Sequence, residues 1–233
     1  MALAVFVVGA LTLTGFIAWA THRSAKMLQQ VEVDFNLLLL PIENLLRLGL
    51  VVACLALGWI SGLPREQFGW VSYAPFADIA IGLAVGVVVQ IPLNKLTNWA
   101  IGRFGSQIYS PVVIRSVLPR TRGEWAPVLP ALFLAVLVEE LLFRSLWLGG
   151  LGLFLPIPVL VVGTALLFGW MHGPQGPLGV VMTATISVLL AGLFLWRGSL
   201  LPPMVAHYVV NLLQLLVAYR HRDRLFGAYR KTN

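Results

Sequence analysis

The stretch Glu139-Glu140-Leu141-Leu142-Phe143-Arg144 places three charged side chains inside a long apolar run, which extends from Trp125 to Leu148. An acidic residue at the centre of a membrane helix costs roughly 3 kcal/mol on insertion scales. Ionisable side chains in such positions face a cavity or the interior of a helix bundle, and they mark functional sites by default. The stretch therefore predicts a site inside a membrane protein.

The composition also indicates a membrane protein. Of the 233 residues, 59% are hydrophobic and only 11% are charged, and the mean hydropathy is +0.88. A soluble domain carries about 25% charged residues. The net charge of +7 is shared with many nucleic-acid-binding proteins, but here the basic residues lie in loops beside apolar runs. That pattern orients a protein in a bilayer, so we predict no nucleic-acid partner.

A membrane-spanning helix needs about 20 apolar residues, and by this measure we count about seven spans. They cover residues 2–20, 36–60, 76–100, 125–148, 155–172, 177–196 and 202–219. We predict an all-α fold, a polytopic membrane helix bundle with about seven transmembrane helices. No basic segment precedes the first run, which predicts a retained span and no cleaved signal peptide.

Lys and Arg residues are divided unequally between alternate loops. One set contains Arg23, Lys26, Arg103, Arg115, Arg120, Arg122 and, in the tail, Arg220, Arg222, Arg224, Arg230 and Lys231. The other set contains only Arg65 and Arg197. By the positive-inside rule, the N-terminus lies outside and the C-terminus in the cytoplasm. We therefore predict a multi-pass protein of the cell (plasma) membrane.

Other polar groups in the apolar runs have simpler explanations. Glu43 precedes Arg47 by four residues, so the two are expected to pair on one helix face. Asp78 opens the third run, where the helix dipole stabilises an acid, and we expect a helix cap. Cys54 is the only cysteine, so the sequence predicts neither an intrachain disulfide nor a thiolate metal cluster.

The three charges of the fourth run fall on two faces of a helix. Glu140 and Arg144 are four residues apart and share one face, whereas Glu139 points about 100° away. Arg144 can then neutralise Glu140, which leaves Glu139 to face a cavity as a general base. The structural alternative is an ion pair that holds helices together, with no role for Glu139.

Two histidines and an asparagine lie in later runs. The fifth run ends in Phe168-Gly169-Trp170-Met171-His172-Gly173-Pro174, and His207 and Asn211 share a face of the last run. Each of these alone is typical of a helix end or of contacts between membrane helices. Together with two carboxylates, they supply the base, imidazoles and oxyanion partner that amide hydrolysis needs. If Pro156 and Pro158 precede the helix of the fifth run, that helix is short, and we expect it to end within the bilayer beside a wet cavity.

The combination Glu139-Glu140-x-x-x-Arg144, Phe168-x-x-x-His172 and His207-x-x-x-Asn211 resembles the CPBP intramembrane protease family. This family includes the CAAX prenyl endopeptidases and bacterial abortive-infection and bacteriocin self-immunity proteins. The resemblance covers about Trp125 to Tyr219. It implies three parts: residues 1–120 with N-terminal transmembrane helices and a basic cytoplasmic segment, residues 121–220 with a CPBP-like protease core, and residues 221–233 with a basic cytoplasmic tail.

The resemblance also implies a role for each matched residue. Glu139 would activate water, and His172 would assist it. His207 and Asn211 would bind the oxyanion. Glu140, Arg144 and Phe168 would support them. This mechanism requires no cofactor. The alternative is a zinc ion held by Glu139, His172 and His207.

The implied activity is that of an intramembrane endopeptidase that cleaves a membrane-embedded or lipidated peptide. Prenylated CAAX peptides are expected as substrates only where prenylation exists. The alternative from a different class is a non-proteolytic multi-pass subunit of a larger membrane protein complex built on the same fold, because fold does not fix function. Its partners would be other membrane protein subunits. Membrane lipids surround the chain on either hypothesis.

Overall fold

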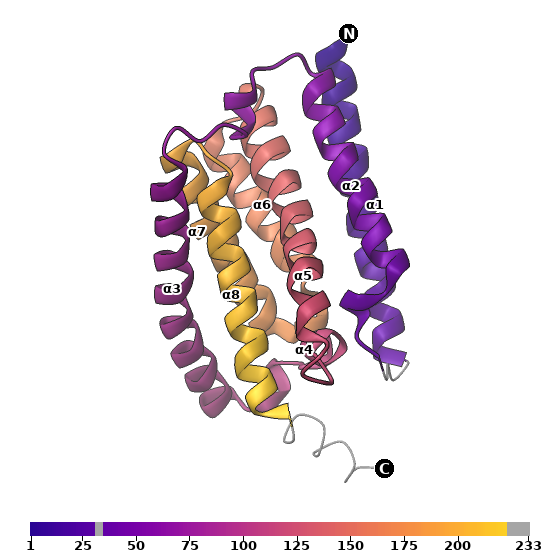
Figure 1. Ribbon diagram of the computed structural model, residues 1–233, viewed down its shortest axis with the longest axis vertical. Helices are drawn as coiled ribbons and strands as arrows, with labels where there is room; N and C mark the ends of the chain where they lie inside the picture. The colour runs from indigo at the N-terminus through magenta and orange to yellow at the C-terminus, as the bar shows by residue number, and fades with distance from the viewer. Residues whose placement is uncertain (31–34, 223–233) are drawn as a thin grey trace.

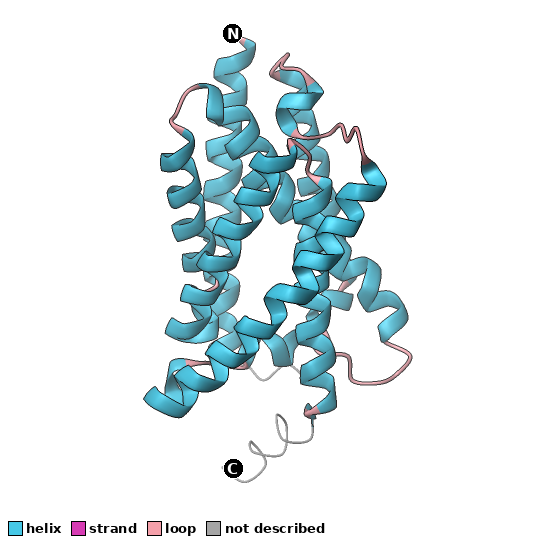
Figure 2. Cartoon of the chain, turned by 90° about the vertical axis from the view of Figure 1, so that its left-hand side faces the viewer, coloured by secondary structure: helices cyan, strands magenta, loops and turns pink. Residues whose placement is uncertain are grey.

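The computed structural model describes residues 1–30 and 35–222, and within them the chain is a bundle of helices without a β-strand (Figure 1, Figure 2). The α-helices are α1 (Ala2–Gln30), α2 (Pro41–Ile60), α3 (Pro75–Phe104), α4 (Val112–Val117), α5 (Trp125–Glu140), α6 (Ile157–Met171), α7 (Gly176–Arg197) and α8 (Leu201–Arg220). A π-helix, η4 (Leu141–Gly150), continues α5. Short 3-10 turns are η1 (Leu37–Leu39), η2 (Arg65–Phe68), η3 (Ser106–Ile108), η5 (Leu151–Leu153) and η6 (Gly173–Gln175).

The helices confirm the predicted fold. Among the described residues, six helical segments are long and apolar enough to cross a membrane, and α6 is a shorter apolar helix of 15 residues. The chain is therefore a multi-pass membrane protein. The N-terminus and the end of α8 lie at opposite ends of the bundle (Figure 1). The boundaries differ in detail: α1 continues past the predicted residue 20, and α2 begins at Pro41, where proline is suited to the first helical turn.

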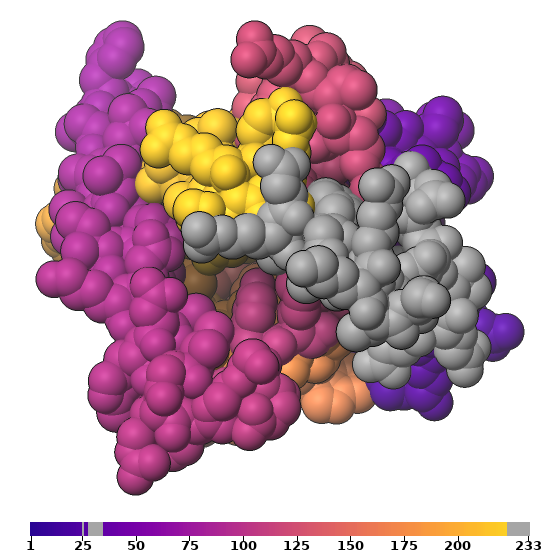
Figure 3. Space-filling view, turned by 90° about the horizontal axis from the view of Figure 1, so that it is seen from below, coloured from indigo at the N-terminus to yellow at the C-terminus, as the bar shows by residue number. Residues whose placement is uncertain are grey.

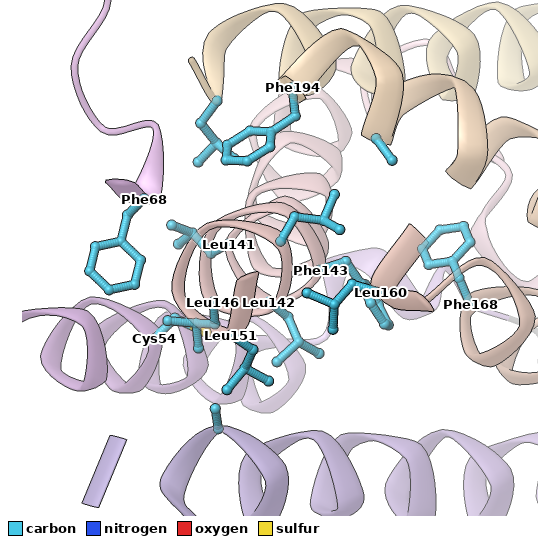
Figure 4. Close-up of a cluster of buried hydrophobic side chains, with 14 of the residues drawn as sticks. Cys54, Phe68, Leu141, Leu142, Phe143, Leu146, Leu151, Leu160, Phe168 and Phe194 are labelled. Carbon is cyan, nitrogen blue, oxygen red and sulfur yellow. The ribbon is translucent and has the colours of Figure 1, made fainter. Parts of the chain in front are cut away.

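The segment formed by α5 and η4 lies at the centre of the bundle. In the most apolar 18-residue stretch of this segment, 50% of the residues are buried, compared with 11% in the corresponding stretch of α2. Apolar side chains from η4 project on several sides into a shared core (Figure 4), to which Cys54 of α2, Phe68 of η2, Phe168 of α6 and Phe194 of α7 contribute. Glu140 and Arg144 of the central segment are thus enclosed by other helices, whereas Glu139 is partly exposed.

Two glycines bring α3 and α8 into close contact. A Cβ atom at Gly82 would lie 2.7 Å from Val205, and one at Gly86 would lie 2.7 Å from Val209. Small residues at such positions let membrane helices approach closely. His207 is two residues from each valine, about 200° around the helix. The packing of α3 therefore turns His207 toward the centre of the bundle.

Two predictions about charges outside the central segment have different outcomes. The Glu43–Arg47 pair forms, with 3.8 Å between Oε2 and Nη2. Asp78 lies in the first turn of α3, but it is buried, and its Oδ1 accepts a hydrogen bond from Nε of Arg197 at 2.8 Å. The prediction of a simple helix cap missed this partner, because Arg197 is 119 residues away.

Other predictions stay untested. The sides of the membrane, the domain boundaries and the cytoplasmic location of the basic tail remain predictions. Residues 223–233 of that tail lie outside the described part of the chain.

Candidate intramembrane active site

The site begins where α5 changes into a π-helix. The change falls directly after Glu140, and η4 then runs for 10 residues. π-helical turns are rare, usually short, and frequent at functional sites. Three of the matched residues, Glu139, Glu140 and Arg144, lie at this junction or in the first turn after it.

Glu140 and Arg144 form the ion pair predicted from their spacing. Nη1 of Arg144 lies 3.1 Å from Oε1 of Glu140, and the side chains are 1% and 0% exposed. Charges so far from water are costly unless they are paired and hydrogen-bonded. The pair therefore allows a carboxylate to be placed deep in the bundle.

Arg144 also connects three helical segments. Its Nη2 donates hydrogen bonds to the backbone oxygen and to Oγ of Ser187 in α7, at 3.1 and 3.2 Å. Its guanidinium lies over the ring of Phe168 in α6, 5.6 Å from the ring centre. Sequence reasoning missed Ser187, although a serine in an apolar run is a signal for such a contact. These contacts fix the position of Arg144, and through it that of Glu140.

His207 lies between the two glutamates. Its Nδ1 is 2.7 Å from Oε1 of Glu140, and its Nε2 is 3.5 Å from Oε2 of Glu139. The His207 side chain is 4% exposed and that of Glu139 is 33% exposed. The two neighbouring carboxylates therefore differ in environment, since Glu140 is enclosed and ion-paired while Glu139 has access to the outside of the bundle.

Phe168 brings the two histidines into one region. Its ring centre is 4.5 Å from that of His172 and 6.0 Å from that of His207. The 15 residues of α6 give it a length of only about 22 Å, short of the roughly 30 Å hydrocarbon core of a bilayer. The expected short helix is thus observed, although only Pro156 precedes it and Pro158 lies in its first turn. Because α6 ends early, His172 can lie near a histidine that comes early in α8.

His172 and Asn211 are less tightly bound than His207. Nδ1 of His172 is 2.7 Å from the backbone oxygen of Phe168. In the described part of the chain, His172 forms no ion pair with a carboxylate, and the partly exposed Asn211 side chain forms no hydrogen bond. Their polar atoms are available to another molecule. Their assigned roles stay predictions.

The residues named for zinc do not form a set of ligands in this geometry. Over residues 1–30 and 35–222, no three His, Cys, Asp or Glu side chains are grouped as a metal site. Both nitrogens of His207 face carboxylates, and one nitrogen of His172 faces a backbone oxygen. Three converging protein ligands are the usual minimum for a catalytic zinc ion. These side chains therefore do not fit a catalytic zinc ion.

A known family matches the segment that contains the whole site. Residues 121–213 match the family model described as type II CAAX prenyl endopeptidase, Rce1-like. This segment is Rce1-like. The match confirms the resemblance to CPBP intramembrane proteases that the three motifs indicated. The Rce1-like segment includes α5, η4, α6, α7 and the site-bearing part of α8. No curated protein and no solved structure matches the chain.

Proposed function

We propose that the chain is an intramembrane endopeptidase in which Glu139 activates the attacking water. The observation that supports this most directly is the array Glu139–His207–Glu140–Arg144, in which only the outermost carboxylate is appreciably exposed. A purely structural ion pair would need Glu140 and Arg144 alone. A second carboxylate and an imidazole beside them provide the groups for general acid and base catalysis.

The contacts of His207 support a path for the proton in this mechanism. In a neutral imidazole one nitrogen carries hydrogen and the other carries a lone pair. Nδ1 donates to the Glu140 carboxylate at 2.7 Å, so the lone pair is on Nε2, which faces Glu139. Glu139 takes a proton from water while the water oxygen attacks the peptide carbonyl carbon. The proton then passes to Nε2, and the ion-paired Glu140 stabilises the resulting imidazolium.

The remaining residues serve the tetrahedral intermediate. The imidazolium of His207 gives its proton to the leaving amine as the C–N bond of the substrate breaks. His172 and Asn211 have unused polar atoms, and we assign them to the carbonyl oxygen, on which negative charge develops. This exchanges the roles that the resemblance implied for His172 and His207, because both nitrogens of His207 face carboxylates. Phe168 keeps the two imidazoles at a fixed separation through its ring contacts.

The substrate that we propose is a membrane-embedded or lipid-modified peptide. Two features support this choice: the Rce1-like segment and the location of the glutamates in the most buried membrane helix. A peptide must reach Glu139 from the membrane or from its surface, since apolar helices surround the site. We place the protein in the plasma membrane with its C-terminus in the cytoplasm.

The experiment is a cleavage assay on purified protein in lipid vesicles, with fluorogenic lipidated peptides and transmembrane peptides as substrates. We expect Glu139→Gln to lower kcat by about 100-fold or more, the usual range for loss of a general base. Glu66→Gln makes the same chemical change at an exposed position in η2 and should leave the rate unchanged. Full activity of Glu139→Gln would contradict the proposal.

A different result would favour the non-proteolytic alternative. In that case, purification from native membranes would yield the chain in a complex of fixed stoichiometry. Assembly of the complex would be unchanged in Glu139→Gln and His172→Ala variants, and no peptide would be cleaved.

A further inference from the structure

A groove lies between the second half of α1 and the C-terminal end of α6. It has a volume of about 350 Å³ and is lined by His22 and Lys26 on one side and by Leu166, Trp170, Met171 and Gly173 on the other. A second hollow, also of about 350 Å³, adjoins it on α1 beside Trp19 and Arg23. The groove exists because α6 ends at Met171 while α1 continues to Gln30. We call the two together the basic groove.

The basic groove combines cations with aromatic rings. The guanidinium of Arg23 lies over the Trp19 ring at 5.7 Å, and the His22 ring stacks on Trp170 with 5.7 Å between centres. Within residues 1–30 and 35–222, neither Arg23 nor Lys26 forms an ion pair with a carboxylate. Among the residues that the structure describes, no carboxylate neutralises these two positive charges beside the groove.

The walls next to these cations are apolar and open to lipid. Leu166, which lines the groove, is 66% exposed. Outside the groove, Val162 and Phe16 lie about one turn earlier on α6 and α1 and are 57% and 44% exposed. The cations lie at or just beyond the end of the first candidate span, Ala2–Ser24. A ligand that fits both the cations and the apolar walls has an anionic group at the membrane surface and an apolar chain in the bilayer. The turn after α6, in orange, reaches the surface at this end of the bundle (Figure 3).

We propose that the basic groove binds the phosphate headgroup of an anionic membrane phospholipid. Arg23 and Lys26 contact the phosphate, and Trp19 and Trp170 lie at the headgroup level, where tryptophan is enriched in membrane proteins. Basic pockets between transmembrane helices are a recurrent form of lipid recognition. The volume of the groove is within the range of small-molecule sites. Lipid binding here does not depend on the chain being a protease.

The test is native mass spectrometry of the detergent-purified full chain titrated with phosphatidylglycerol and, separately, with phosphatidylcholine. We expect one phosphatidylglycerol to bind in preference to phosphatidylcholine. The double variant Arg23→Gln/Lys26→Gln should bind it at least about tenfold more weakly, since each basic residue near a headgroup contributes about fivefold. Arg103→Gln/Arg220→Gln removes the same charge from exposed positions outside the groove and should bind normally.

Several outcomes would overturn the proposal. Equal binding of the two lipids by the unchanged protein would do so, and that measurement needs no variant. Equal loss in both double variants would mean that net charge, and not this groove, attracts the lipid. Displacement of the lipid by millimolar inorganic phosphate would indicate a site for soluble anions, and displacement by an acidic peptide would indicate a peptide site.

Discussion

Two buried ion pairs in this protein have different designs. Glu140–Arg144 is local, four residues apart on the central helix, and both side chains are almost wholly enclosed. Asp78–Arg197 joins the start of α3 to the end of α7, and the Arg197 side chain is 27% exposed. The first pair lies among Glu139, His207 and Phe168, whereas the second lies at the end of the bundle where α7 turns into α8.

The two pairs also differ in how fully their oxygens are bonded. Asp78 accepts from Nε of Arg197 through Oδ1 and from the hydroxyl of Ser72 through Oδ2. Oε1 of Glu140 is shared between Arg144 and His207, while Oε2 is buried without a hydrogen-bond partner among the described residues. A buried polar atom without a partner costs about 1–3 kcal/mol. A pair that only held helices together would have no reason to retain that cost, so the contrast separates a structural pair from a functional one.

The largest effect is expected from Arg144→Met. It leaves the Glu140 carboxylate enclosed without its cation, and breaking a buried pair in this way typically costs about 3–5 kcal/mol. The double variant Glu140→Gln/Arg144→Met should recover part of that stability but no activity, because the charge is gone while the array is still broken. Thermal unfolding in detergent would measure the stability of both variants, and the peptide-cleavage assay would measure their activity.

Arg47→Met is the matched control for this experiment. It breaks another Glu–Arg pair with the same spacing, but its side chains are 19% and 41% exposed. Partly exposed pairs contribute about 1 kcal/mol or less. If Arg144→Met and Arg47→Met were equally stable, enclosure of the Glu140 pair would not matter, and the comparison would fail.

A smaller effect is expected from Asp78→Ala, about 1–3 kcal/mol, from the lost hydrogen bonds to Arg197 and Ser72. The cation left behind is partly exposed, so water can solvate it. We expect lower thermal stability but unchanged kcat for the folded protein, since the pair lies away from the glutamates. A large fall in kcat at a temperature where the variant is fully folded would mean that this pair positions the site.

The two pairs show which contacts a sequence predicts. The Glu140–Arg144 pair and the Glu43–Arg47 pair were predictable, because spacing of four along a helix fixes proximity. The Asp78–Arg197 contact was not, since it depends on how α3 packs beside the turn between α7 and α8. The apolar runs predicted the bundle for a similar reason: hydropathy and length identify membrane helices without knowledge of their neighbours.

The candidate site was predictable in its members but not in its arrangement. The sequence indicated the two glutamates, Arg144 and His207, but not that His207 lies between Glu139 and Glu140. That position depends on the close approach of α3 and α8 and on the rotation of α8 that follows from it. The π-helix after Glu140 was also unforeseen, because a change of helical hydrogen bonding leaves no clear pattern in an apolar segment.

The smallest effect is expected from Ser187→Ala, which tests most directly whether Arg144 positions the site. It removes the hydroxyl that accepts from Nη2 of Arg144 at 3.2 Å but leaves the backbone oxygen at 3.1 Å, so we expect a loss of about 0.5–1.5 kcal/mol in stability. Because Arg144 is then held less firmly, we also expect a modest fall in kcat with little change in KM. Thr185→Ala removes a hydroxyl from an exposed position on the same helix, where it bonds only to its own backbone, and serves as the control. If Ser187→Ala lowered stability but left kcat at the level of the control, Arg144 would act only as a structural cation. The Glu140 pair would then belong to the same class as the pair at Asp78.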